Sequence, residues 1–188
     1  ERAGYDILPA NRDLAGAEVE LVDEAAREYR LKRALEAVSE EYDYILIDCP
    51  PALNMLTVNA LVAARSVMIP MQCEYYALEG LSDLVNTVKK VKAKLNPGIE
   101  ISGLLRAMFD PRNSLAQQVS EQLKRHFGGK VYDALIPRNV RVAEAPSHGL
   151  SVLAYDRTSK GAQAYMNLAR EMLRREEGTE EGMQHGKA

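Results

Sequence analysis

The sequence predicts an α/β fold in which a mostly parallel sheet is flanked by helices. Apolar runs of strand length alternate with segments of helical period, which is the pattern of repeated βα units. Several of these runs are apolar on both faces, as the buried strands of parallel sheets are. The length of 188 residues, with 46% hydrophobic and 27% charged residues, suits one globular domain and excludes fibrous and membrane-spanning classes.

Short apolar runs bounded by polar or breaker residues are expected to form the strands. They cover residues 5–9, 44–48, 66–71, 99–108, 131–136 and 151–154.

Helices are expected where apolar residues recur at i, i+3, i+4 and i+7. The clearest covers 81–95 and stops before an Asn-Pro-Gly sequence; another covers 115–127 and stops at two glycines. The same spacing predicts helices over 24–38 and 162–173. From residue 176 onward glutamate, glycine, glutamine and lysine dominate, so residues 176–188 are expected to form a disordered tail.

Net charge limits the possible binding partners, and the cysteine content indicates the state of the thiols. A net charge of −3 and a pI near 5.7 argue against a dedicated polyanion-binding protein, although a local basic patch is compatible with them. Cys49 and Cys73 are too few for a disulfide framework, and their apolar surroundings favour reduced thiols in the core.

The segment YDYILIDCPP, residues 42–51, is the most informative part of the sequence. An apolar run ends in Asp48, and ligands of open parallel sheets bind beyond the carboxyl ends of the strands. A carboxylate there could hold Mg²⁺ near a nucleotide phosphate, as the second acidic motif of P-loop NTPases does. A solvated aspartate before a proline turn is the competing interpretation.

A phosphate site also needs a glycine-rich loop with lysine and a hydroxyl residue, and the sequence contains none. Gly129-Lys130 lacks the upstream glycine and Gly186-Lys187 is followed by alanine. Either Asp48 is only structural, or an N-terminal piece that precedes Glu1 carries the loop.

Several long stretches resemble the ParA/Soj family of chromosome- and plasmid-partitioning ATPases, which are deviant P-loop relatives of MinD, and the similarity is greatest to chromosomal Soj. The stretches are LAGAEVELV (14–22), YDYILIDCPPAL (42–53), LTVNAL (56–61), PMQCEYYALEGLSDL (70–84), MFDPRN (108–113) and IPRNVRVAEAPSHG (136–149).

The resemblance implies a cytoplasmic, nucleoid-associated switch. Family members bind ATP and Mg²⁺, form a homodimer, bind DNA without sequence specificity and hydrolyse ATP when a ParB-type protein stimulates them; they have no membrane partner. Their P-loop lysine and switch I aspartate precede the segment that matches this chain. Residues 1–175 would then be a partial ParA-type nucleotide-binding domain without its N-terminal βα portion and without catalytic residues of its own.

The resemblance also assigns roles to individual residues. Asp48 would lie near Mg²⁺ and bind it through water. Pro137 and Asn139 match the loop that contacts adenine, and Arg112 and Arg141 match DNA-binding arginines. Arginine suits phosphate because its planar guanidinium donates two parallel hydrogen bonds.

Three other functions compete with this interpretation. A non-enzymatic fragment that binds DNA or protein without ATP turnover is the main alternative, because the phosphate loop is absent. A MinD-like membrane helix does not suit the acidic tail, and an iron–sulfur relative would need more cysteine ligands. Arg106 departs from the family, which has a small polar residue at this position.

Overall fold

The structure is a computed structural model that describes residues 4–50 and 52–185. The chain divides into two compact units, which are described separately. The first comprises Glu1–Val67 and Asn86–Glu100, and the second comprises Met68–Val85 and Ile101–Ala188.

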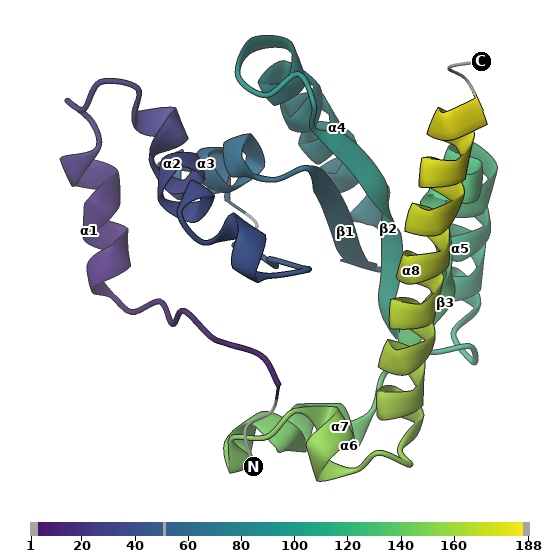
Figure 1. Cartoon of the computed structure of the whole chain (residues 1–188). Coiled ribbons are helices and arrows are strands. Elements are labelled where there is room, and N and C mark those ends of the chain that lie inside the picture. Colours follow the sequence, from purple (N-terminus) through teal and green to yellow (C-terminus); the bar gives the residue numbers. More distant parts are fainter. Residues whose placement is uncertain (1–3, 51, 186–188) are drawn as a thin grey trace. The chain divides into compact units, whose positions relative to one another are not determined.

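A sheet of three strands is the centre of the α/β fold (Figure 1). The strands β1 (Ser66–Gln72), β2 (Glu100–Phe109) and β3 (Val131–Pro137) lie in the order β1-β2-β3, and β2 pairs in parallel with β3. The helices α4 (Ala77–Lys94) and α5 (Ser114–Phe127) connect them. These five elements confirm the strands predicted at 66–71, 99–108 and 131–136 and the helices predicted at 81–95 and 115–127.

The first unit is built from short helices joined by asparagine side chains. They are α1 (Asp13–Glu20), η1 (Arg27–Tyr29), α2 (Arg30–Glu36), η2 (Ser39–Glu41) and α3 (Met55–Ala63). Asn59 of α3 is buried; it accepts from the amide of Leu31 at 3.1 Å and donates to the carbonyl of Arg27 at 2.9 Å. The helix predicted over 24–38 is shorter than expected, because Ala26 has a φ of 53° and interrupts it.

Three predicted strands are wrong. Residues 5–9 and 44–48 are extended, but neither segment is assigned to a strand, and Leu46 is 83% exposed. A strand requires backbone pairing with a neighbour, and an apolar pattern does not specify that neighbour. Residues 151–154 instead begin the short helix α7 (Val152–Tyr155), because the Ser151 hydroxyl caps it by accepting from the amide of Ala154 at 3.2 Å.

The C-terminal helix α8 (Lys160–His185) contains the predicted helix at 162–173 and continues through residues 176–185. The sequence predicts a disordered tail there. The side chains at 176–178 are exposed, in keeping with a composition that offers little to pack, and residues 186–188 lie outside the described part.

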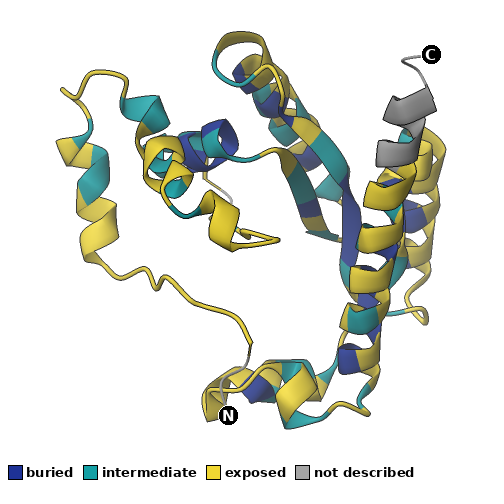
Figure 2. Cartoon of the chain, viewed as in Figure 1, coloured by how far each residue is buried: buried dark blue, intermediate teal, exposed yellow. Residues whose placement is uncertain are grey.

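The core of the second unit lies between the sheet and α8. Figure 2 shows buried positions along β2 and on one side of α8, with exposed positions on the other side. Leu105, Tyr132, Ile136, Ala164 and Leu168 form one buried cluster. Burial of such side chains is the main favourable term in the free energy of folding.

The pairing of β3 with β2 is irregular, and side chains replace the missing backbone partners. Between the paired positions Leu104↔Val131 and Arg106↔Leu135, β3 advances four residues while β2 advances two. Arg106 is 4% exposed, and its Nη2 donates to the carbonyls of Tyr132 at 2.8 Å and Asp133 at 3.0 Å. Because Tyr132 is buried, a partner for its carbonyl avoids a desolvation cost.

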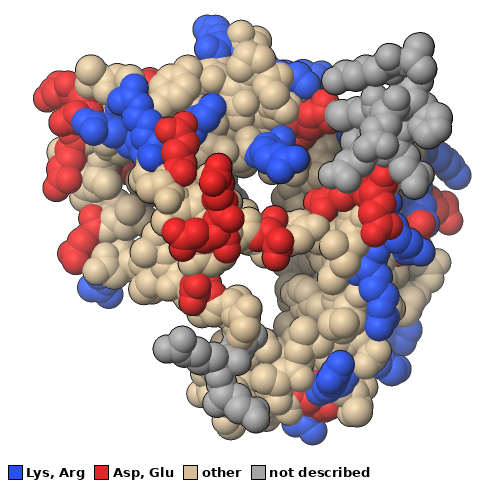
Figure 3. All heavy atoms as spheres, viewed as in Figure 1, with Lys and Arg blue, Asp and Glu red and all other residues tan. Residues whose placement is uncertain are grey.

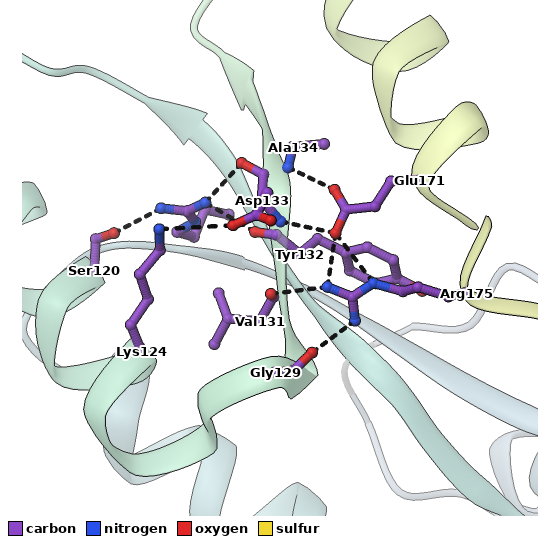
Figure 4. Close-up of polar contacts among 10 residues, drawn as sticks. Ser120, Lys124, Gly129, Val131, Tyr132, Asp133, Ala134, Glu171 and Arg175 are labelled. Atoms are coloured by element: carbon purple, nitrogen blue, oxygen red, sulfur yellow. Dashed lines mark hydrogen bonds and ion pairs between the residues drawn. The ribbon is translucent and has the colours of Figure 1, made fainter. Parts of the chain in front are cut away.

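Two side chains of α8 bind the same part of β3 (Figure 4). The carboxylate of Glu171 accepts from the amides of Asp133 at 2.9 Å and Ala134 at 2.7 Å. Arg175 donates to that carboxylate and to the carbonyl of Val131 at 2.9 Å, and its guanidinium lies 4.2 Å from the centre of the Tyr132 ring. Side chains of β2 and of α8 therefore both bind the irregular strand β3.

Candidate functional site

The candidate site lies where β2 and β3 end in the second unit. Phe109 and Pro137, the last residues of the two strands, are paired, and the amide of Arg138 donates to the carbonyl of Phe109 at 3.4 Å. Residues that follow the two strands are consequently neighbours. The carboxyl ends of parallel strands are where open α/β sheets bind ligands.

Pro137 borders a hollow of about 450 Å³ beside β3 and the start of α8. The proline is half-buried. The hollow is lined by Asp133, Ala134, Leu135, Pro137, Thr158, Lys160, Gln163, Ala164 and Asn167.

Asn139 is fixed by its role as the N-cap of the short helix α6 (Val140–Glu144). Its Oδ1 accepts from the amide of Val142 at 3.2 Å, so only the amide NH₂ group is left to donate to a ligand. Gly161 packs tightly against this cap: a Cβ there would lie 3.0 Å from Asn139 Oδ1 and 2.3 Å from Val142 Cγ2. Any side chain at position 161 would therefore require Val142, and to a smaller extent Asn139, to shift.

Arg112 is exposed and bound to Asp110 in the loop after β2. Its Nε donates to Asp110 Oδ1 at 3.0 Å and its Nη2 to Oδ2 at 2.9 Å, which is a bidentate pair. The backbone amide of Arg112 also donates to Oδ1 at 3.0 Å. The hydrogen bonds from Arg112, with a smaller contribution from the charge of Arg138, lower the pKa of Asp110 to about 2.

Arg141 lies on α6 between two carboxylates. Its Nη1 donates to Glu144 Oε2 at 2.9 Å, and its Nε lies 3.5 Å from Asp156 Oδ2. The hydroxyl of Tyr155 donates to the same Glu144 oxygen at 3.4 Å. The two arginines assigned to DNA by the family motif are therefore both engaged with acidic side chains.

Asp48 belongs to the first unit and is exposed. The neighbouring Cys49 is exposed as well, which corrects the expectation of a core thiol, whereas Cys73 is buried as predicted. Partial burial and, to a smaller extent, the charge of Asp48 raise the pKa of the Cys49 thiol. The structure thus groups Pro137, Asn139 and the arginines in one unit and describes Asp48 in the other; Pro51 lies outside the described residues.

Sequence reasoning missed the acidic partners of the arginines. Asp110 and Glu144 are two and three residues away from their arginines, so local spacing could have indicated them, but Asp156 could not be found that way. Tyr75 and Tyr76 are 73% and 74% exposed and contact each other edge to face.

Charge on the surface is mixed. On the face drawn in Figure 3, lysines and arginines lie among acidic side chains and form no continuous basic field. Within residues 4–50 and 52–185 there is no group of three or more His, Cys, Asp or Glu side chains suited to a metal. None of the helices in the described part is long and apolar enough to cross a membrane.

Comparisons with known proteins identify the family. A family model described as an AAA domain matches residues 1–101. The chain is 55% identical to the chromosome partitioning protein ParA of Caulobacter vibrioides, over 94% of this chain and 67% of the relative. It is 58% identical to the sporulation initiation inhibitor protein Soj of Bacillus subtilis, over 89% of this chain and 66% of the relative.

A solved structure supports the fold. The cobyrinic acid a,c-diamide synthase of Mycobacterium smegmatis, crystallised with an ATP analogue and magnesium, superposes with a TM-score of 0.76 at 38% identity. The match covers 89% of this chain and 62% of that structure, so the chain spans about two thirds of its relatives. The predicted fold class is confirmed, and the chain belongs to the ParA/Soj family of chromosome-partitioning ATPases.

Proposed function

We propose that the protein containing this chain is an ATP-dependent partitioning switch. It would bind ATP and Mg²⁺, form a homodimer, bind DNA without sequence specificity and be stimulated by a ParB-type partner at the nucleoid. The observation that carries the proposal is the 55% identity to a chromosome partitioning ParA, which extends over 94% of this chain and includes the loops after β2 and β3.

The residues at the end of β3 fit an adenine base in part. Pro137 presents a ring beside a hollow, and flat apolar groups suit the face of a base. Asn139 keeps an amide NH₂ group that could donate to a ring nitrogen of the base, while its oxygen is held by the α6 cap.

Asp48 fits a magnesium ion that is bound largely by water and phosphate. Mg²⁺ prefers oxygen ligands and is usually held by one or two carboxylates together with waters and substrate phosphates, so a single exposed aspartate is compatible with it. When bound, the ion would neutralise phosphate charge; the residue's part is to orient the water shell.

DNA binding is assigned to Arg112 and Arg141. Both lie in the second unit, and both are more than half exposed in their side chains. Because such contacts are electrostatic, the affinity would fall with salt concentration.

Binding of a fluorescent ATP analogue tests the nucleotide assignment. We expect Mg²⁺-dependent binding to the full-length protein and none to the 188-residue chain, because phosphate binding needs a glycine-rich loop that the chain's sequence lacks. Tight binding to the 188-residue chain would show that another loop holds the phosphates. If neither protein binds the analogue while both bind DNA, the alternative of a non-enzymatic binding module gains support.

A further inference from the structure

Asp110 and Arg112 lie in a hydrogen-bonded loop between β2 and α5. Asn113 caps α5 by accepting from the amides of Leu115 at 3.0 Å and Ala116 at 3.3 Å, and its own amide donates to the carbonyl of Asp110 at 3.1 Å. The first turn of α5 therefore already has its acceptor, and Arg112 is the group of this loop that remains suited to an anion.

The side chain of Arg112 is 90% exposed, and the Nε–Nη2 edge of its guanidinium is bound to Asp110. The remaining N–H groups can still bind a phosphate, but the negative charge of the Asp110 carboxylate lies beside them and opposes a second anion.

From this geometry we infer that Asp110 is a positioning residue that holds Arg112 and limits its affinity for polyanions. The inference rests on the proposed DNA-binding function and adds a regulator to it. The negative charge of Asp110 would repel a phosphate bound to the free N–H groups of Arg112, which weakens non-specific binding and lets the protein leave DNA more readily.

Asp110→Asn tests the inference with little change in shape. The amide oxygen of asparagine can still accept from the backbone amide of Arg112, which keeps the loop, but the charge that holds the guanidinium is gone. Because the carboxylate that opposes phosphate becomes neutral, we expect duplex DNA to bind about two- to fivefold more tightly to the full-length protein with ATP. The slope of log K against log salt should steepen by up to about one.

Two comparisons separate this effect from a general change in charge. Glu121→Gln removes the same charge from the exposed Glu121–Arg125 pair on α5 and should leave both affinity and salt slope nearly unchanged. In an Arg112→Ala background, Asp110→Asn should lose its effect, because the group that it frees is absent.

Equal effects of Asp110→Asn and Glu121→Gln, or an undiminished effect of Asp110→Asn without Arg112, would overturn the role of Asp110 while leaving DNA binding intact. Failure of the unsubstituted protein to bind DNA would overturn the proposed function and this inference together. Tighter binding that depends on Arg112, with a steeper salt slope, supports the inference.

Discussion

The carboxylate of Glu171 on α8 accepts a hydrogen bond from the backbone amide of Ala134 on β3 at 2.7 Å, across 37 residues of sequence. A helix side chain thereby accepts a hydrogen bond that a carbonyl of a neighbouring strand usually accepts. The contact lies where the register of β3 is irregular: between the pairs Leu104↔Val131 and Arg106↔Leu135, β3 advances four residues while β2 advances two.

Glu171→Gln should destabilise the protein by about 2 kcal/mol at neutral pH, because charge-assisted hydrogen bonds to buried groups are lost. Burial raises the pKa of Glu171, but the hydrogen bonds from Ala134, Asp133 and Arg175 outweigh it, so the pKa lies below its usual 4.5. This contribution to stability is present above pH 4.5 and is lost as the pH falls through the folded-state value.

Urea unfolding between pH 7 and pH 3 measures this effect. The unsubstituted protein should lose more stability than Glu171→Gln as the pH falls through this range. Glu121 forms an exposed ion pair with Arg125, so Glu121→Gln serves as a control. Its free energy of unfolding should depend on pH as that of the unsubstituted protein does. Parallel curves for Glu171→Gln and the unsubstituted protein would contradict the assignment.

Gly161→Ala should disturb the Asn139 cap. The added Cβ would lie 2.3 Å from Val142 Cγ2 and 3.0 Å from Asn139 Oδ1, so overpacking should cost about 1–3 kcal/mol of stability. If Asn139 contacts the base, the affinity for an ATP analogue should fall as well.

Gly80→Ala on α4 is the matched control, because its Cβ would have no heavy atom within 4 Å and alanine favours a helix. Thermal unfolding and titration with the fluorescent analogue in the full-length protein measure both quantities. Unchanged nucleotide affinity in a destabilised Gly161→Ala variant would count against the role of Asn139.

Cys49 should react with iodoacetamide in the folded protein, whereas Cys73, which is 5% exposed, should not. Partial burial, and to a lesser extent the charge of Asp48, raises the thiol pKa of Cys49. Asp48→Asn should therefore shift the pH–rate profile of Cys49 alkylation to lower pH. Mass spectrometry of the labelled peptide measures the rate. Faster labelling of Cys73 than of Cys49 would show that the burial assigned to these segments is incorrect.

Local apolar patterns were sufficient to predict a helix with one buried face, such as α4. The spacing of Leu81, Val88 and Val91 indicates the buried stripe of α4, and the structure buries all three. The extended segment 44–48 has an equally strong apolar pattern, but its assignment as a strand depended on a partner elsewhere in the chain.

Only those site residues that lie in family motifs, or close to them in the sequence, could be predicted. Family motifs located Arg112 and Arg141, and the spacing of Asp110 from Arg112 is short enough to suggest their pair. The contact of Glu171 with Asp133 joins residues 38 apart, and no periodicity in the sequence indicates it. Long-range polar contacts of this kind depend on the fold itself.

The binding of β3 by side chains of α8 makes the two edges of the sheet different. The amides of Asp133 and Ala134 and the carbonyls of Gly129 and Val131 already have side-chain partners, so an incoming strand would find them occupied. The part of β3 that α8 binds is thereby closed to a further strand, while β1 forms the other edge of the sheet.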